Sequence, residues 1–577
     1  MKDLLITTAI TEKVKKEETI YLLSNWCNTL RMQEQLKNNK VRILPYHWKS
    51  KEKFNKDYYY LNNLYELNLK ILANILGRYH KTSQEINYWR IVIGPWLYQF
   101  SGIAFDRYSQ TKIVKNKKNL YTNILDFNQN DLISENFKDF YNQSKKDLWN
   151  HNLIGIIWKD LGLSYENISQ RKIISKKENR SLEIIIKNLI NKIGFKIQKN
   201  NNYIFHNTNI SFQKLLKINL KLMQFPTKTY ELNEYKFSNQ VFSNIRQEIK
   251  KKLCKSNEYE IILAKLISIF LPRIYLEDFQ INKSIALKIL PSNPKKIFTS
   301  HSYLFDDLFK IWVAEKKLSK KAEYYIIQHG GCVRTCKLDQ EEEHYIKSSD
   351  GFISWGWKLK NKPIIDWLPS LQLKNQIIKN KKNGDIVIIL ASYPRYFYIH
   401  YSVPISDDYL DYLDNIEYLF KKVYLLNKQK VKIRFAKEDS GWESEKRLFA
   451  RLKYIKKDDN KKSISETIKN YKLAFCTANS TVFLETLSYN FPTLVFIDLR
   501  FYEIRQDVLK DFIKLNKVGI CFFDKESILE HLSSINNDIN KWWYSYDVQL
   551  KRIEFVNKFA NTSNKYSSKW LQFIKKI

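Results

Sequence analysis

Small hydroxyl residues followed by a carboxylate mark the stretch CTANSTVFLETL, residues 476–487. A strand-forming run, 472–476, ends there, and Ser480 and Thr481 then begin a helix-forming segment. Backbone N–H groups at a helix start point outward, at the positive end of the helix dipole, which is an arrangement that binds phosphate. Glu485, one turn further on, is placed to accept hydrogen bonds from ribose hydroxyls. The pattern predicts a nucleotide site; a capped helix with a solvated glutamate is the alternative.

Two adjacent glycines follow a second strand-like run, YYIIQHGG at 324–331, in a chain with only 13 glycines. Gly330 and Gly331 permit positive φ and a close approach of a ligand to the backbone. His329 is placed to donate to a phosphate or a sugar hydroxyl. A tight turn beside a packed histidine is the alternative, and no Gly-Lys-Ser/Thr follows that would make a P-loop.

Four further polar residues follow predicted strands. Arg434 and Lys437, in VKIRFAK, could neutralise a diphosphate, and Ser392 and Arg395, in ASYPRY, lie on the loop after the predicted strand 385–392. Ligands of open parallel sheets bind beyond the carboxyl ends of the strands, so all four are candidate donor-binding residues. Solvated strand ends would give the same pattern.

The N-terminal region is rich in Tyr and Trp and contains a few charged groups. This pattern is typical of a sugar-binding wall, and equally of an aromatic core. The candidate acceptor-site residues are His47, Asp57, Arg90, Asp106 and Arg107.

Continuous β-branched runs that alternate with helical patterns predict parallel sheets covered on both faces. We therefore expect an α/β protein with two doubly wound, Rossmann-like domains facing a cleft, at 1–370 and 371–577. The Lys- and Asn-rich segment at about 110–280 is expected to be a helical insertion in the first. The predicted elements of the second domain are strands 385–392, 431–436, 472–478, 492–498 and 518–523 and helices 407–424 and 480–490.

The chain is strongly basic, with 97 Lys and Arg against 60 Asp and Glu and a formal charge of +37. Such a field attracts nucleic acid, anionic lipid or phosphorylated substrates. Heavy use of Lys, Asn and Ile throughout the chain explains the charge equally well without any partner. A nucleic-acid-binding protein is disfavoured, because the lysines are dispersed and no recognised nucleic-acid-binding motif is present.

Cysteine spacing and apolar runs give expectations about compartment and metal. Six scattered cysteines without a CxxC pair predict a reduced, cytosolic protein with no zinc site. The N-terminal run is not a signal peptide, and the longest apolar run, 261–272, is too short to span a bilayer. We expect a cytoplasmic protein, at most peripheral on the inner face of the membrane.

Several motifs together resemble a family of transferases from bacterial O-antigen and surface-carbohydrate loci. That family is similar to GT-B glycosyltransferases, near the capsule enzymes that move Kdo-type sugars. The motifs are YHWKSKEKFNKDYYYLNNLYE (46–66), NYWRIVIGPWL (87–97), FDRY (105–108), QHGG (328–331), SWGW (354–357), and NSTVFLETL (479–487) with PTLVFID (492–498).

The resemblance implies a metal-independent transfer of a sugar from a nucleotide-sugar donor to a surface-glycan or lipid-linked acceptor. Asn479, Ser480 and Thr481 would hold the donor phosphate and Glu485 the ribose. His329, Gly330 and Gly331 would close the cleft from the N-terminal domain.

An inverting enzyme needs a proton acceptor, for which Asp106, Asp57 and His47 are candidates in that order. A retaining enzyme needs none. The alternatives within enzymes are a polyol-phosphate transferase of the teichoic-acid type and, less favoured, a diphosphate-sugar epimerase.

Overall fold

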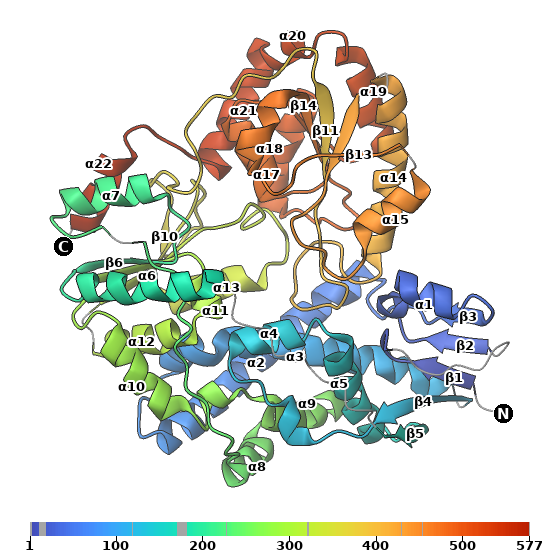
Figure 1. Cartoon of the computed structure of the whole chain (residues 1–577), viewed down its shortest axis with the longest axis vertical. Helices are drawn as coiled ribbons and strands as arrows, with labels where there is room; N and C mark the ends of the chain where they lie inside the picture. Colours follow the sequence, from blue (N-terminus) through green and yellow to red (C-terminus); the bar gives the residue numbers. More distant parts are fainter. Residues whose placement is uncertain are drawn as a thin grey trace.

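The computed structural model describes residues 3–10, 19–117, 119–169, 182–226, 228–319, 322–427, 430–452 and 454–575. Residues 118, 170–181 and 227 of the expected insertion lie outside these ranges. Three sheets are formed in the described part, and their strands pair in parallel throughout. Figure 1 shows the third sheet and its helices, in orange and red, above the other two.

The first sheet has the strand order β3-β2-β1-β4-β5. Its strands are β1 (Asp3–Ile6), β2 (Thr19–Leu22), β3 (Lys40–Ile43), β4 (Leu120–Leu125) and β5 (Tyr165–Ile168). The helices of this region are α1 (Leu30–Gln35), α2 (Lys51–Tyr79), α3 (Ile86–Lys112), α4 (Phe137–Gln143) and α5 (Asp147–Asp160). α3 is buried along nearly its whole length, because α2, α5, α12 and α13 pack around it.

The second sheet runs in sequence order, β10-β9-β8-β7-β6. Its strands are β6 (Tyr203–His206), β7 (Lys296–Thr299), β8 (Glu323–Ile327), β9 (Gly351–Ile353) and β10 (Ile364–Ile365). The helices in residues 182–348 are α6 (Leu182–Gln198), α7 (Phe212–Lys221), α8 (Ser243–Lys252), α9 (Glu258–Phe270), α10 (Phe279–Ile289), α11 (Ser302–Phe305), α12 (Asp307–Leu318) and α13 (Gln340–Ser348). Of these, α8 and α9 pack against α2 and α3 of the first region.

The third sheet has the strand order β13-β12-β11-β14-β15-β16. Successive strands are added on one side of β11 as far as β13 and then on its other side from β14 onward, so the topological switch point lies between β11 and β14. Its strands are β11 (Asp385–Ile389), β12 (Val431–Arg434), β13 (Lys456–Lys457), β14 (Tyr471–Cys476), β15 (Thr493–Phe496) and β16 (Cys521–Phe522). Its helices are α14 (Asp408–Leu426), α15 (Ser444–Arg451), α16 (Ile464–Thr467), α17 (Thr481–Ser488), α18 (Gln506–Lys517), α19 (Lys525–Ile535), α20 (Ile539–Trp543) and α21 (Tyr546–Phe559).

The last helix, α22 (Tyr566–Lys575), returns to the second sheet. Trp570 and Ile574 pack against Phe205, Phe298 and Tyr325, on the face that α7 also covers. The C-terminal end of the chain therefore completes the core of a sheet built from the N-terminal part.

The predicted α/β class, with parallel Rossmann-like sheets, is confirmed, and each strand predicted after residue 384 is present. One expectation differs from the structure. Residues 110–280, expected as a helical insertion, also supply β4 and β5 to the first sheet and β6 to the second. Residues 1–370 consequently hold two sheets where one was expected.

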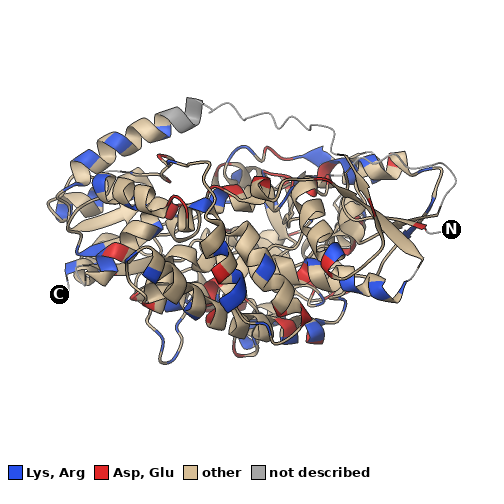
Figure 2. Ribbon diagram, turned by 90° about the horizontal axis from the view of Figure 1, so that it is seen from below, with Lys and Arg blue, Asp and Glu red and all other residues tan. Residues whose placement is uncertain are grey.

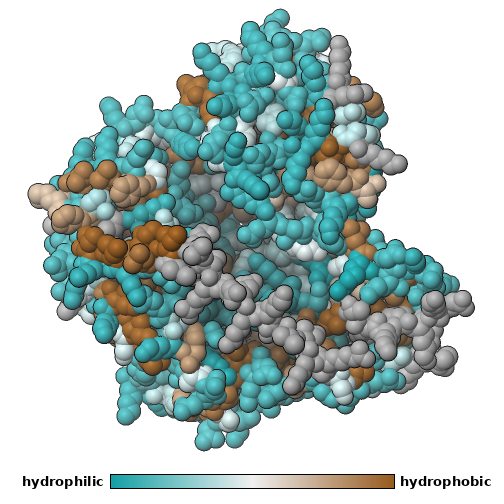
Figure 3. All heavy atoms as spheres, viewed as in Figure 1, coloured by the Kyte–Doolittle hydropathy of each residue, from teal (hydrophilic) through white to brown (hydrophobic). Residues whose placement is uncertain are grey.

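Charged and apolar residues are distributed differently over the molecule. Lys and Arg are spread over the ribbon and mixed with acidic residues, without one basic stripe (Figure 2). The face in Figure 3 is largely hydrophilic, with brown atoms gathered over α6. Among the described helices, none is long and apolar enough to cross a membrane.

Candidate functional site

A pocket of about 380 Å³ lies at the point where the third sheet reverses its strand order. Leu390 follows β11, Arg434 and Lys437 lie at and after the end of β12, and Glu485 and Tyr489 come from α17 and the residue after it. Such a switch point is where open α/β sheets bind their ligands. The structure thus brings together Arg434, Lys437 and Glu485, which were singled out from the sequence.

A second hollow, of about 310 Å³, lies next to the first and shares Leu390 and Lys437 with it. Ser392 lines this hollow, and its hydroxyl donates to Ser440 Oγ at 2.8 Å. The two spaces form one groove along the carboxyl ends of β11 and β12. Lys437 is common to both parts and forms no ion pair with any described carboxylate, so its charge is available to a ligand.

Glu485 is a carboxylate that faces this pocket from α17. Burial raises its pKa, while Lys374 and a hydrogen bond with Tyr489 act in the opposite direction. A carboxylate so placed can accept hydrogen bonds from ligand hydroxyls, and acid removes this capacity at a higher pH than for an exposed glutamate.

Arg434 has its positive charge already satisfied within the protein. Its guanidinium donates to the Asp458 carboxylate, to Asp459 O at 3.1 Å and to Thr467 Oγ1 at 3.2 Å. These bonds fix the end of β12 to the loop at 458–467. Arg434 therefore shapes the pocket wall, whereas Lys437 has no ion-pair partner among the described residues.

The glycine loop after β8 touches the start of α17 directly. The Gly331 N–H donates to Thr481 Oγ1 at 3.0 Å. A Cβ atom on Gly331 would lie 2.5 Å from Thr481 N and 2.6 Å from the carbonyl carbon of Ser480. Neither Gly330 nor Gly331 has a positive φ, so the glycine is needed for close contact between two loops and not for an unusual backbone angle.

Asn479 and Ser480 differ in their access to a ligand. Asn479 is buried and donates from Nδ2 to Thr335 Oγ1 at 2.8 Å, while its Oδ1 has no partner in the described part of the chain. Ser480 is half-exposed, at the N-cap of α17, and its side chain caps no backbone N–H. Asn479 thus joins the two loops, and Ser480 leaves the helix start accessible.

Two histidines lie side by side at the carboxyl ends of neighbouring strands. His301 follows β7, His329 follows β8, and their ring centroids are 4.5 Å apart. Burial lowers the pKa of His329 to about 4 and that of His301 to about 3, so both rings are neutral near pH 7. Asn209 Nδ2 donates to His301 Nε2 at 2.5 Å, whereas His329 Nδ1 has no partner among the described residues.

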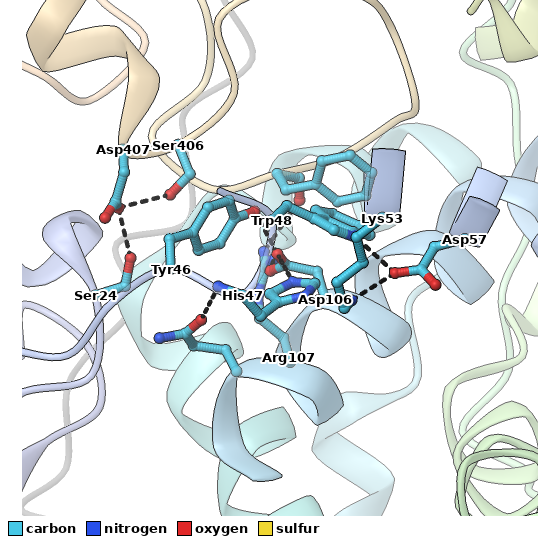
Figure 4. A network of polar contacts seen from close by, with 12 residues as sticks. Ser24, Tyr46, His47, Trp48, Lys53, Asp57, Asp106, Arg107, Ser406 and Asp407 are labelled. Atoms are coloured by element: carbon cyan, nitrogen blue, oxygen red, sulfur yellow. Dashed lines mark hydrogen bonds and ion pairs between the residues drawn. The ribbon is translucent and has the colours of Figure 1, made fainter. Parts of the chain in front are cut away.

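The three candidate proton acceptors lie together in an enclosed network (Figure 4). Asp106 has no exposed side-chain surface and accepts from Tyr46, from His47 Nε2 at 3.0 Å and from Arg107. Burial alone would raise the pKa of Asp106, but Arg107 and His47 hold it below its usual range. Burial lowers the pKa of His47.

Asp57 belongs to the edge of the same network. It accepts from Trp48 Nε1 at 2.8 Å and from Lys53 Nζ at 2.6 Å. Arg107 also donates to Phe397 O at 3.1 Å, in the loop between β11 and α14. The network therefore connects the first region to the third sheet.

Two further arginines named from the sequence are committed to ion pairs. Arg395 is buried and donates to Asp147 Oδ2 at 2.7 Å and to Trp26 O, and it lines neither pocket. Arg90 makes two hydrogen bonds to Glu66, at 2.9 and 2.7 Å.

Sequence reasoning did not find Lys374, which lines the pocket, or His301, which lies beside His329. The signal for His301 is its position. It follows the strand KIFT by two residues, in the same position relative to its strand as His329. Applying the strand-end rule to every strand would have found it. In the described part of the chain, no group of three or more His, Cys, Asp or Glu side chains could hold a metal ion.

The fold is therefore a doubly wound α/β fold with a groove at a topological switch point. The chain belongs to a transferase family: the model of the LIC12162 family transferase matches residues 3–574. No curated protein matches the sequence.

Several solved structures are similar to the chain at low identity. A co-structure of S. aureus MnaA with UDP has 9% identity and a TM-score of 0.35, over 65% of this chain and 95% of that one. An alpha,alpha-trehalose-phosphate synthase (UDP-forming) from Burkholderia vietnamiensis has 8% identity and a TM-score of 0.35, over 65% of this chain and 99% of that one. A Thermobaculum terrenum O-GlcNAc transferase mutant has 7% identity and a TM-score of 0.32, over 85% of this chain and 90% of that one. Similarity this low carries no information on substrate.

Proposed function

We propose that this transferase is a GT-B glycosyltransferase that moves a sugar from a nucleotide-activated donor to an acceptor of surface-glycan assembly, of the O-antigen or capsule type. The observation that carries the proposal is the groove at the switch point of the third sheet. It is lined by a carboxylate, Glu485 of α17, and by a cation that has no ion pair within the described part of the chain, Lys437 after β12. These groups suit the ribose and the phosphate of a nucleotide, respectively.

The donor would lie with its nucleotide in the groove and its sugar toward the glycine loop. Lys437 and the start of α17 would stabilise the negative charge on the departing nucleotide, which requires no bound metal. Gly331, in contact with Thr481, would close the groove from the second sheet.

The acceptor hydroxyl loses a proton in an inverting transfer. His329 is neutral, and its Nδ1 has no partner among the described residues, so it has the protonation state that a proton acceptor needs. We place this role at His329 ahead of Asp106, Asp57 and His47, because that network is enclosed by its own hydrogen bonds. A retaining transfer would leave His329 to bind the acceptor.

We propose that the protein acts in the cytoplasm, at the inner face of the membrane, where lipid-linked acceptors are presented. Its donor is a nucleotide-sugar, and its acceptor is a glycan or a lipid-linked glycan.

A thermal-shift screen against CMP, CDP, UDP, GDP and dTDP tests the nucleotide groove. A nucleotide at a hundredfold excess over its dissociation constant stabilises the protein by about 2.7 kcal/mol. A selective CMP response would support a Kdo- or sialic-type donor, and a selective diphosphate response a hexose donor.

Glu485→Gln should weaken binding of the responding nucleotide by about ten- to a hundredfold, because hydrogen bonds to a charged acceptor contribute about 1.5–3 kcal/mol. The amide retains the shape of the side chain, so the melting temperature without ligand should stay close to wild type. Glu530→Gln, at an exposed position on α19, is the matched control. If none of the five nucleotides binds, or if Glu485→Gln binds like wild type, the groove is not a nucleotide site.

A further inference from the structure

Helix α6 exposes a stripe of apolar residues and packs against the protein with another side, which includes Phe195. Five apolar residues, spaced at three and four, form one stripe, and each is between 39% and 58% exposed: Ile186, Leu189, Ile190, Ile193 and Ile197. Asn191, Phe195 and Gln198, on another side of the helix, are buried. A surface helix ordinarily keeps its apolar residues on the core, so the additional stripe that faces solvent is unusual.

The turn after α7 extends the apolar surface at one end of α6. Met223 is 91% exposed and Phe225 is 72% exposed. Asn201, just beyond α6, donates from Nδ2 to Phe225 O at 3.3 Å, so this turn lies beside the C-terminal end of the helix. We call the α6 stripe together with Met223 and Phe225 the α6 surface; Figure 3 shows brown atoms over α6.

A basic hollow lies along one side of the α6 surface. It has a volume of about 730 Å³, and five lysines line it with a single carboxylate, Glu234. No described carboxylate forms an ion pair with any of these lysines, so their charge faces solvent. The lysines are Lys192, Lys196 and Lys199 of α6 with Lys236 and Lys288.

The exposed apolar residues and the basic hollow together distinguish between classes of partner. A soluble polyanion such as nucleic acid would pair with the lysines and leave seven apolar side chains in water. An anionic bilayer satisfies both groups, since apolar side chains enter the acyl boundary while lysines remain among the head groups. No described helix is long and apolar enough to span a bilayer, so the protein would lie on its surface.

We propose that the α6 surface docks the protein on an anionic lipid bilayer, with lipid head groups occupying the basic hollow. The choice of a lipid partner rests on the proposed function at the membrane. Docking through α6 would hold the second sheet, with its His301 and His329 loops, at a fixed orientation to lipid-linked acceptors.

Flotation of the full-length protein with two kinds of vesicle tests the proposal. One kind is pure phosphatidylcholine and the other contains about a third phosphatidylglycerol. Wild type should float with the anionic vesicles and largely stay behind with the neutral ones, and binding should fall as salt is raised. Absence of binding to the anionic vesicles would overturn the proposal.

Two double variants separate the apolar and basic contributions. Leu189→Ser with Ile193→Ser, and Lys192→Glu with Lys196→Glu, should each lower partitioning to anionic vesicles at least tenfold. All four side chains are exposed, so folding should be retained. The controls are Leu425→Ser, an exposed residue of α14, and Lys510→Glu with Lys517→Glu, exposed on α18. Equal losses in the controls would show that binding depends only on general surface character and would overturn the proposal.

Two companion measurements keep other outcomes distinct. Nucleotide-induced thermal shifts should be the same in the α6 variants and wild type, so failure of lipid binding and failure of the nucleotide groove are seen separately. Light scattering would detect a dimer that the serine variants dissociate. Such a result without lipid binding would make the α6 surface a subunit interface and contradict docking to lipid.

Discussion

Gly331 is a residue at which the loop after β8 meets the start of α17 backbone to backbone. A methyl group there would lie 2.5 Å from Thr481 N, a backbone atom that cannot move alone. Gly331→Ala should therefore push the two loops apart and break the hydrogen bond to Thr481. Overpacking of this kind costs about 1–3 kcal/mol. We expect a lower urea midpoint and weaker nucleotide binding.

Gly330→Ala is the matched control for this prediction. The atom nearest to a Cβ at Gly330 is Thr481 Oγ1 at 3.9 Å, which is an ordinary contact distance. The stability of Gly330→Ala and its binding of nucleotide should therefore stay close to wild type. If the two variants behaved alike, the contact between the loops would have no energetic significance.

At the scale of elements, the strands that the sequence predicted consist mostly of buried residues. β11, β14 and β15 consist almost entirely of buried residues and read as continuous apolar runs. β3 and β5 are edge strands with mostly exposed residues, so they carry no pattern that could reveal them. The sequence therefore did not reveal these two strands of the first sheet.

The position of the groove was predictable for the same reason as the strands, because strand ends can be read from the sequence. Ser392, Lys437 and Glu485 line the groove, and their role in binding a donor stays a prediction. The internal partners of Arg434 and Arg395 were not predictable. Asp458 and Asp147 reach them only through the tertiary fold, and spacing along the chain contains no record of these pairs.

His80 ends helix α2 and gives a test of pH dependence at this scale. The side chain is buried, and its Nε2 lies 3.1 Å from Tyr275 O. Burial lowers the pKa of His80 to about 4, and the charge of Lys283 also lowers it. The hydrogen bond to Tyr275 and the charge of Glu277 act in the opposite direction. An unfolded histidine titrates near pH 6.5. Between these values the unfolded chain binds more protons, so stability falls as the pH falls.

His80→Gln removes this titration while keeping an N–H that can donate to Tyr275 O. Between pH 7.5 and pH 5, wild type should lose about 2 kcal/mol more unfolding free energy than the variant. Urea titrations of both proteins at the two pH values measure the difference, in which the other titrating groups cancel. An equal loss in both proteins would mean that His80 is protonated in the folded state.

At the scale of the whole molecule, the three sheets share one continuous core. A single cluster of buried apolar residues includes Ile6 of the first sheet, Ile326 of the second and Phe475 of the third. Helix α22 adds a second connection, because this C-terminal helix packs into the core of the second sheet. Such connections predict that the sheets unfold together.

Trp570→Ala tests this cooperativity. Trp570 is fully buried, and its indole N–H donates to Pro369 O at 2.9 Å. Removing a large buried aromatic side chain costs about 3–5 kcal/mol. If the sheets unfold as one unit, tryptophan fluorescence and far-UV circular dichroism should show the same single transition in wild type, and both should move to lower urea together in the variant. Tyr546→Ala, at a largely exposed position, should leave the midpoint unchanged. If the second sheet of the variant unfolds first, two separate transitions will be seen. That result would show that the packing of α22, and not the shared core, holds the sheets together. A nucleotide bound to the third sheet would then raise the urea midpoint of only the later transition.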